Sequence, residues 1–129
     1  MPWIKTGKLS DGTQGYPDGE LIFYNDKNQI ITKGELFKKV KTGKWYHYYY
    51  DKEVYNIQEF NNDIAGLETF YEIASNQLYS GKFIQTYDNG KIESEFKISD
   101  GLRNGKSIYY DESGKEIKIE KYNRGVLQN

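Results

Sequence analysis

Apolar and polar residues alternate along much of this chain in short runs, and turns that contain glycine separate the runs. The clearest pair of runs is Lys106–Tyr110 and Lys115–Tyr122, where Ile117 and Ile119 alternate with charged residues. Between these runs stands the tetrapeptide Asp111-Glu112-Ser113-Gly114. Alternation with a period of two is typical of a strand with one buried face, and two such runs joined by a Gly turn predict a β-hairpin.

A second hairpin turn is predicted at Asp88-Asn89-Gly90, because glycine adopts the positive φ that tight hairpin turns need. Residues 54–60 come closest to a helical pattern, but the spacing of the neighbouring runs requires a return strand there. We therefore predict strand over 54–60. In residues 1–14 the glycines predict loops around a short edge segment.

Glycines that open an aromatic run recur at a nearly constant spacing, and two rings follow each of them at the fourth and fifth positions. Gly43 follows Gly19 by 24 residues and Gly66 follows Gly43 by 23, whereas Gly105 comes after a longer interval that indicates an inserted or fused partial unit. A fixed period of this length is typical of repeat architectures. We predict an all-β fold of consecutive antiparallel hairpins in a single domain, 1–129, with units near 15–42, 43–65, 66–104 and 105–129.

A Gly-x-x-x-Gly segment precedes the first and the last aromatic runs, at Gly15–Gly19 and Gly101–Gly105. We interpret these segments as connectors between hairpins. A phosphate-binding loop would lead into the N-terminus of a helix, where backbone amides bind the anion. A strand follows here instead, so the glycines are predicted to have a conformational role.

The aromatic content is concentrated in one segment, Trp45-Tyr46-His47-Tyr48-Tyr49-Tyr50. Side chains alternate between the two faces of a strand, so Tyr46, Tyr48 and Tyr50 form one row while Trp45, His47 and Tyr49 form the other. Two interpretations remain open. Either both rows only pack within the repeat, or one of them is a ring-rich surface for a partner, since Tyr, Trp and His combine apolar area with a polar tip.

On the second interpretation, the candidate partner-binding residues are aromatic and acidic side chains of the second and third units. They are Trp45, Tyr46, His47, Tyr48, Tyr49, Tyr50, Phe70, Tyr71, Glu68 and Glu72. Acidic residues around this segment would complement a basic partner and would steer association more than they raise affinity. These residues are Asp51, Glu53, Glu59, Asp63, Glu68 and Glu72.

The available chemistry points away from an enzyme. His47 is the only histidine and the chain has no cysteine, so a His-His pair or a thiolate metal site cannot form. Paired carboxylates such as Asp111 with Glu112 stand in turns, where carboxylates usually accept backbone N–H bonds and stay solvated. We therefore predict no catalytic residues, no cofactor, no metal and no small-molecule substrate.

Charge and hydropathy narrow the partner class. The formal net charge is −1 and basic residues are not clustered, which argues against nucleic acid and, for the same reason, against an anionic membrane. The opening Met1–Gly7 lacks the apolar stretch of a signal peptide, and no window is long and apolar enough to span a bilayer. We expect a cytoplasmic protein that binds another protein.

Residues 100–125 combine the Gly-x-x-x-Gly segment, a Tyr-Tyr pair, a Gly turn, a charged alternating strand and a Tyr-x-x-Gly ending. This pattern resembles the variant MORN repeat, and the chain looks like the bacterial repeat proteins grouped as the YwqK-like antitoxin family. The match extends to 15–31 and 43–72, with departures at Lys52-Glu53 and Ala74-Ser75-Asn76, where turns are expected.

The resemblance implies an elongated, twisted antiparallel sheet that serves as a platform for protein contact. It further implies an immunity protein or antitoxin that neutralises a cognate toxin encoded by an adjacent gene. Two other functions remain open: a peripheral lipid-binding platform, as proposed for longer MORN proteins, and a structural module that self-associates through exposed hairpin edges. Function inferred from a shared fold is analogy, so the residues themselves must carry the case.

Overall fold

The computed structural model describes residues 17–129, and this part of the chain is built from ten β-strands. Its only helical segment is the 3-10 turn η1 (Tyr50–Lys52), and none of its helices could span a membrane. The loops and edge segment predicted for residues 1–14 lie outside the described residues. The strands are β1 (Gly19–Tyr24), β2 (Ile30–Phe37), β3 (Val40–Tyr49), β4 (Val54–Asn61), β5 (Ile64–Glu72), β6 (Gly81–Thr86), β7 (Ile92–Ser99), β8 (Leu102–Tyr110), β9 (Glu116–Asn123) and β10 (Val126–Gln128).

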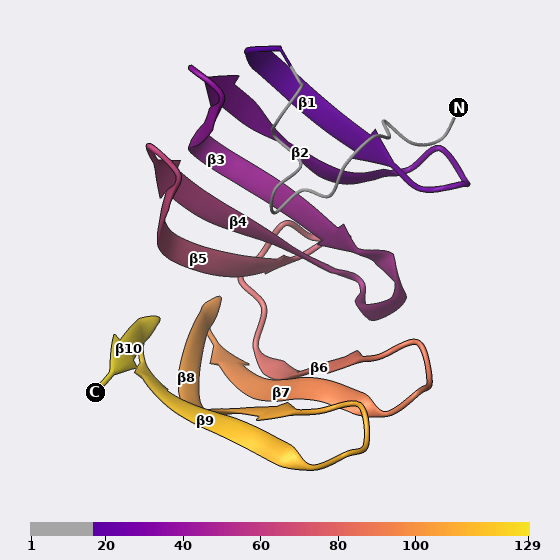
Figure 1. Cartoon of the computed structure of the whole chain (residues 1–129), viewed down its shortest axis with the longest axis vertical. Coiled ribbons are helices and arrows are strands. Elements are labelled where there is room, and N and C mark those ends of the chain that lie inside the picture. The colour runs from indigo at the N-terminus through magenta and orange to yellow at the C-terminus, as the bar shows by residue number, and fades with distance from the viewer. Residues whose placement is uncertain (1–16) are drawn as a thin grey trace. The chain divides into compact units, whose positions relative to one another are not determined.

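The strands form two five-stranded antiparallel sheets, β1 to β5 and β6 to β10, each made of consecutive hairpins (Figure 1). The predicted all-β class is confirmed, and β4 is the strand expected over 54–60. The chain divides into two compact units, residues up to Glu68 with Glu72–Ser75, and Thr69–Tyr71 with Asn76–Asn129. The sequence predicts one continuous sheet. The structure has two sheets instead, because the irregular segment between β5 and β6 interrupts the alternation.

The two sheets are internal duplicates, because each strand of the first sheet begins 62 residues before the corresponding strand of the second. Gly19 and Gly81 open β1 and β6 with positive φ, at 115° and 152°. The strand pairs repeat at the same offset, so that Lys33 lies opposite Tyr46 in the first sheet and Glu95 lies opposite Ile108 in the second. Equivalent positions in the two sheets can therefore be compared directly.

The glycines of the predicted repeat do not all have the same role. Gly43 and Gly105 have positive φ of 72° and 99° and lie inside β3 and β8, next to the register shift that each strand makes against its neighbour. The segment Gly101–Gly105 thus joins the β6–β7 hairpin to the β8–β9 hairpin, and it does so as a tight turn at Asp100-Gly101 followed by the bulged start of β8. Gly66 lies in the interior of β5 and is absent from the positive-φ positions, so it is not equivalent to the other three.

The turns predicted from short Gly-containing motifs are confirmed. In the β8–β9 turn the carboxylate of Asp111 accepts backbone N–H bonds from Ser113 and Lys115, at 2.9 and 3.0 Å. In the β6–β7 turn, Gly90 has φ of 87° and donates its N–H to the carbonyl of Tyr87. Side-chain bonds to the turn backbone are the usual role of Asp and Asn at such positions.

One face of each sheet is the core face. In the first sheet Leu21, Phe23, Leu36 and Trp45 form a buried cluster. In the second unit the buried rings of Phe70, Phe83 and Phe96 pack with centroids 5.2 to 5.9 Å apart. The row that contains Trp45 is therefore the packing row, and the opposite row, which contains Tyr46 and Tyr48, is on the outer face.

Candidate binding surfaces

Four tyrosines stack on the outer face of the first sheet, on β3, η1 and β4. Tyr48 lies between Tyr50 and Tyr55, with ring centroids 5.9 and 5.1 Å away, and Tyr55 also stacks on Tyr46 at 6.5 Å. All four are partly exposed. We call this set the tyrosine ladder: Tyr46, Tyr48, Tyr50 and Tyr55. It presents flat apolar area with hydroxyl groups at its edge, in a fixed arrangement.

Contacts with neighbouring strands hold the ends of the tyrosine ladder. The hydroxyl of Tyr50 donates a hydrogen bond of 2.6 Å to the carbonyl of Ile30, and the Lys33 ammonium lies 4.8 Å from the ring centroid of Tyr46. Burial raises the pKa of the Tyr48 phenol, and nearby Tyr46 raises it further. The pKa of Tyr50 is raised mainly by burial, then by Tyr48. The Tyr48 and Tyr50 phenols therefore stay neutral hydrogen-bonding groups at physiological pH.

A row of charged side chains crosses the same outer face beside the ladder. Glu20 on β1 lies opposite Glu35 on β2, and Lys44 on β3 lies opposite Glu59 on β4. All four are exposed, and we call the three glutamates the acidic row. Glu20, Glu35 and Lys44 line a surface hollow of about 240 Å³, together with Lys33, Gly34 and Tyr46.

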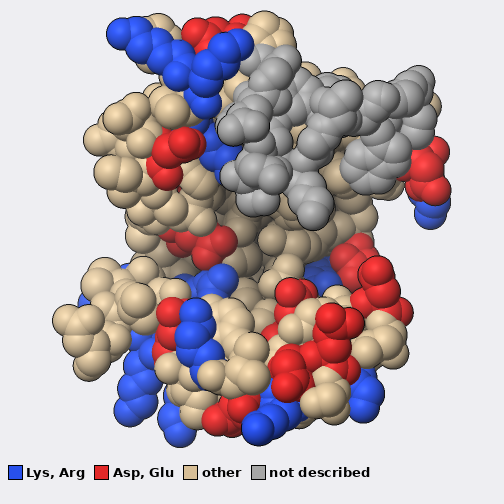
Figure 2. Space-filling view, in the orientation of Figure 1, with Lys and Arg blue, Asp and Glu red and all other residues tan. Residues whose placement is uncertain are grey.

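Charges of both signs are interspersed over the molecular face shown in Figure 2. No large region of a single sign is visible on the described residues of that face. The formal net charge of −1 is therefore a balance of local groups, so that individual rows of charge, and not a general field, decide which partner a surface fits.

The inner face of the first sheet has a second hollow, of about 180 Å³, which contains the only histidine. Nδ1 of His47 and the Thr32 hydroxyl are joined by a hydrogen bond of 2.9 Å. The centroid of the His47 ring lies 4.6 Å from the centroid of the Tyr49 ring. Burial lowers the pKa of His47, so the neutral imidazole is favoured. A hydroxyl partner and a stacked ring are typical of a histidine that packs within the sheet.

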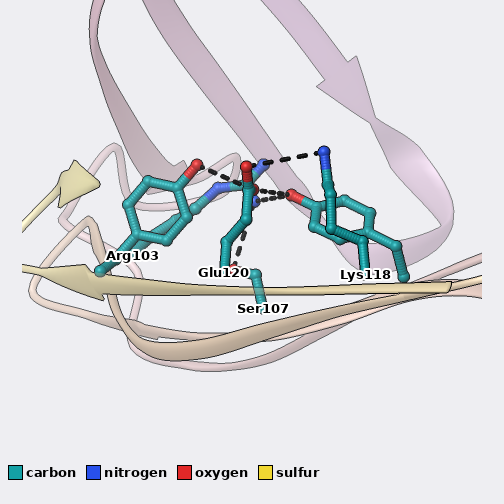
Figure 3. A network of polar contacts seen from close by, with 6 residues as sticks. Arg103, Ser107, Lys118 and Glu120 are labelled. Atoms are coloured by element: carbon teal, nitrogen blue, oxygen red, sulfur yellow. Dashed lines mark hydrogen bonds and ion pairs between the residues drawn. The ribbon is translucent and has the colours of Figure 1, made fainter. Parts of the chain in front are cut away.

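At the equivalent place in the second unit a polar network replaces the hollow. Figure 3 shows Glu120 between Arg103 and Lys118. Glu120 accepts a hydrogen bond of 2.9 Å from the hydroxyl of Tyr109, and that hydroxyl is also 3.1 Å from the Arg103 guanidinium. Arg103 lies 3.7 Å from the centroid of the Phe96 ring. Burial raises the pKa of Tyr109, with a further contribution from the bond to Glu120. Each charge has a partner, so we assign this network to stability.

Neither inner-face cluster resembles a metal centre or a prepared acid–base pair. Within residues 17–129 no group of three or more His, Asp or Glu side chains is arranged to hold a metal ion. No buried side-chain nitrogen or oxygen atom in that part of the chain is left without a hydrogen-bond partner. Polar groups whose bonds are all made within the protein are typical of structural networks.

The structure corrects part of the predicted contact surface. Trp45 and Phe70 are 4% and 1% exposed, so they are core residues and offer no area to a partner. His47 and Tyr49 belong to the same inner face as Trp45, since they share its side of β3. Tyr46, Tyr48 and Tyr50 lie together on the outer face, and the sequence predicted that these three side chains form one row.

The other predicted contact residues, Glu68, Tyr71 and Glu72, lie on β5. Glu68 accepts a hydrogen bond of 2.6 Å from the Asn56 side chain, and Glu72 accepts one of 2.7 Å from Ser75. Tyr71 makes an isolated bridge to Leu78. Tyr55 was missed, although its place in the return strand over 54–60 and opposite Tyr48 follows from the hairpin register.

Comparisons with known proteins add no relative: no protein-family model, curated protein or solved structure matches this chain. The resemblance to the variant MORN repeat stays a prediction that rests on residues 15–31, 43–72 and 100–125. The outer faces of the two sheets therefore provide the basis for a functional proposal.

Proposed function

We propose that this chain is a protein-binding module that contacts its partner through the tyrosine ladder and the acidic row of the first sheet. Its role in this proposal is that of an immunity protein or antitoxin that neutralises a cognate bacterial toxin by direct binding. The observation that carries the proposal is the stack of four partly exposed tyrosines on the outer face.

Tyrosine suits such a surface for a physical reason. A Tyr side chain buries a large apolar ring with only two rotatable bonds, and its hydroxyl keeps a hydrogen bond available at the rim. The ladder is already ordered, because its rings stack on one another and Tyr50 is bonded to the backbone of β2. Side chains that are ordered before binding lose little entropy when a partner arrives.

The charges beside the ladder specify the kind of partner. Glu20, Glu35 and Glu59 are exposed along one line of the face, while Lys33 lies over Tyr46 and Lys44 stands among the glutamates. A partner with lysine or arginine side chains opposite the glutamates would be attracted and correctly oriented. We therefore expect a protein with a basic, partly aliphatic contact surface.

Blocking a toxin by binding requires a surface and no reactive group, so the inner-face clusters need no chemical role in this function. The toxin-neutralising role rests on the resemblance to the YwqK-like family. The contact surface rests on the geometry of the first sheet. The two parts can be tested separately.

Growth rescue on coexpression with the product of the adjoining gene tests the toxin-neutralising role. Wild-type chain should restore growth and copurify with that product, and Tyr48→Ser with Tyr55→Ser should abolish both effects. Tyr110→Ser is the matched control, because Tyr110 is the counterpart of Tyr48 in the second sheet. Rescue by the Tyr48/Tyr55 variant would exclude the ladder, and sedimentation of the chain with anionic liposomes would favour a lipid platform instead.

A further inference from the structure

The outer face of the second sheet carries four exposed lysines in one line across the strands. Lys82 on β6 lies directly opposite Lys97 on β7, and Lys106 on β8 lies directly opposite Lys121 on β9. We call these four residues the lysine row. Like charges on directly opposed positions of neighbouring strands destabilise a sheet. A row of this kind therefore favours an anionic occupant.

Apolar side chains adjoin the lysine row on the same face. Ile84, Ile108 and Ile119 occupy the next line across the sheet, and Ile119 is 46% exposed. Glu95 interrupts this line between Ile84 and Ile108 and lies 3.9 Å from the Lys82 ammonium. The face thus combines a positive line, an aliphatic line and one carboxylate.

At most positions that carry a charge on the outer face of the second sheet, the equivalent residue of the first sheet carries the opposite charge. Each residue of the acidic row is 62 positions before a residue of the lysine row, and Lys33 stands where the second sheet has Glu95. Only the counterparts Lys44 and Lys106 carry the same sign on these two lines of described residues. The reversed pairs are Glu20 and Lys82, Glu35 and Lys97, Glu59 and Lys121, and Lys33 and Glu95.

We propose that these two faces bind each other between molecules: the lysine row of one copy docks on the acidic row of a second copy. The contact uses a different patch from each molecule, so it is heterologous and adds copies head to tail. It does not depend on the partner proposed above. That partner would compete for the acidic row, and its expected chemistry is the one that the lysine row displays.

The rows can meet in a simple way. When two sheets pack face to face by rotation about an axis parallel to their strands, each line of residues stays opposite the corresponding line, and the strand order is reversed. Because all four positions of the basic line are lysine, every glutamate of the acidic row meets a lysine whatever the strand order. In this line across the first sheet, which also holds the acidic row, Lys44 is then the one charged residue that faces a lysine.

The size of the contact sets its strength. Four strands spaced by about 4.8 Å give a face roughly 15 Å wide. Because its two lines of residues are only about 7 Å apart along the strands, this face has a much smaller area than the roughly 800 Å² per partner of a standard stable interface. We therefore expect a weak association that grows with protein concentration and that salt disrupts, because exposed charges are screened beyond about 10 Å at 0.1 M ionic strength.

Sedimentation velocity over a concentration series tests the proposal with two charge-reversal variants. One has two acidic faces (Lys82→Glu, Lys97→Glu and Lys121→Glu), and the other has two basic faces (Glu20→Lys, Glu35→Lys and Glu59→Lys). Each variant alone should associate at least about tenfold more weakly than wild type. An equimolar mixture of the two should regain association, because each supplies the face that the other has lost.

Further variants separate this contact from general charge effects. A control variant changes the net charge by the same amount as the three lysine-row substitutions: Lys27→Glu, Lys91→Glu and Lys115→Glu. These residues lie in exposed hairpin loops, so the control should leave association unchanged. Lys44→Glu should strengthen it. A wild-type chain that stays monomeric at every concentration overturns the proposal, as does a mixture that fails to reassociate. Association that all variants and salt leave unchanged would also overturn it and would indicate pairing through strand edges.

Discussion

The indole ring of Trp45 lies directly over Gly34 on the neighbouring strand, so closely that a Cβ atom on Gly34 would clash with the atoms of the ring. In the second sheet the large and the small residue of this pair exchange positions. There the counterpart of Gly34 is Phe96, and the residue opposite it, at the position of Trp45, is Ser107. In each sheet one large ring fills the space between these two positions.

Gly34→Ala should therefore destabilise the first unit by about 1 to 3 kcal/mol, which is the usual cost of excess volume in a packed core. The backbone of Gly34 is not among the positive-φ positions, so the loss would come from the indole contact and not from backbone strain. Chemical denaturation followed by Trp45 fluorescence measures it. Gly66→Ala is the control, since a Cβ there meets its nearest atom at 3.4 Å.

The swapped arrangement gives a sharper test of the same packing. Gly34→Phe alone should prevent the first unit from folding, while Gly34→Phe combined with Trp45→Ser copies the pair of the second sheet and should recover much of the stability. Double-mutant analysis of the four proteins isolates the coupling. Additive effects of the two substitutions would show that the two positions do not share one space.

The half-buried His47 should make the free energy of unfolding depend on pH. Burial lowers the pKa of His47 in the folded state, so the unfolded chain binds a proton more readily than the folded chain. Stability should be fully present above the unfolded value of 6.5 and should fall as pH decreases from there towards the lower folded value. Urea midpoints at several pH values above 5 measure this slope, and His47→Asn should remove it. An unchanged slope in that variant would assign the effect to other groups.

The β2–β3 turn stores backbone strain that a glycine would relieve. Lys38 and Lys39 have φ of 54° and 69°, as in a type I′ turn, where Asn-Gly is preferred. Both amides donate to the carboxylate of Asp18 at 2.9 Å, which holds the turn. Lys39→Gly should raise the free energy of unfolding by about 1 kcal/mol, because a non-glycine residue pays for this conformation.

Asp63→Gly tests that explanation at the equivalent position of the β4–β5 turn. Asp63 has φ of 70°, so glycine would relieve the same strain, but its carboxylate accepts a 2.8 Å bond from the Lys41 amide. We expect little or no gain from Asp63→Gly in thermal denaturation. An equal gain from both substitutions would mean that the bond from the Lys41 amide to the Asp63 carboxylate contributes nothing.

Local motifs explain which parts of the fold were predictable. The turns at Asp88-Asn89-Gly90 and Asp111–Gly114 were predicted because their residues dictate the backbone by themselves. The Lys38-Lys39 turn gives no such signal, since its strain is compensated by Asp18, 20 positions away in the chain. Gly66 was grouped with the repeat glycines because spacing alone does not report φ.

The functional surface was only partly predictable for a related reason. Alternation separates the side chains of β3 into two rows, but it does not say which row is buried. The burial of Trp45 and Phe70 depends on packing against residues of other strands. The sequence of one strand does not show that packing. The charge reversal between the two sheets becomes visible only when strand register aligns positions 62 residues apart.

Calorimetric titration measures directly whether the outer face of the first sheet binds a protein partner. The adjoining gene product is titrated into wild type, Tyr48→Ser with Tyr55→Ser, and Tyr110→Ser. If the ladder is a binding hot spot, the double substitution should weaken binding by about thirtyfold or more, whereas Tyr110→Ser should leave it unchanged. Equal affinity of all three proteins for that product would show that the tyrosine ladder is not the binding surface.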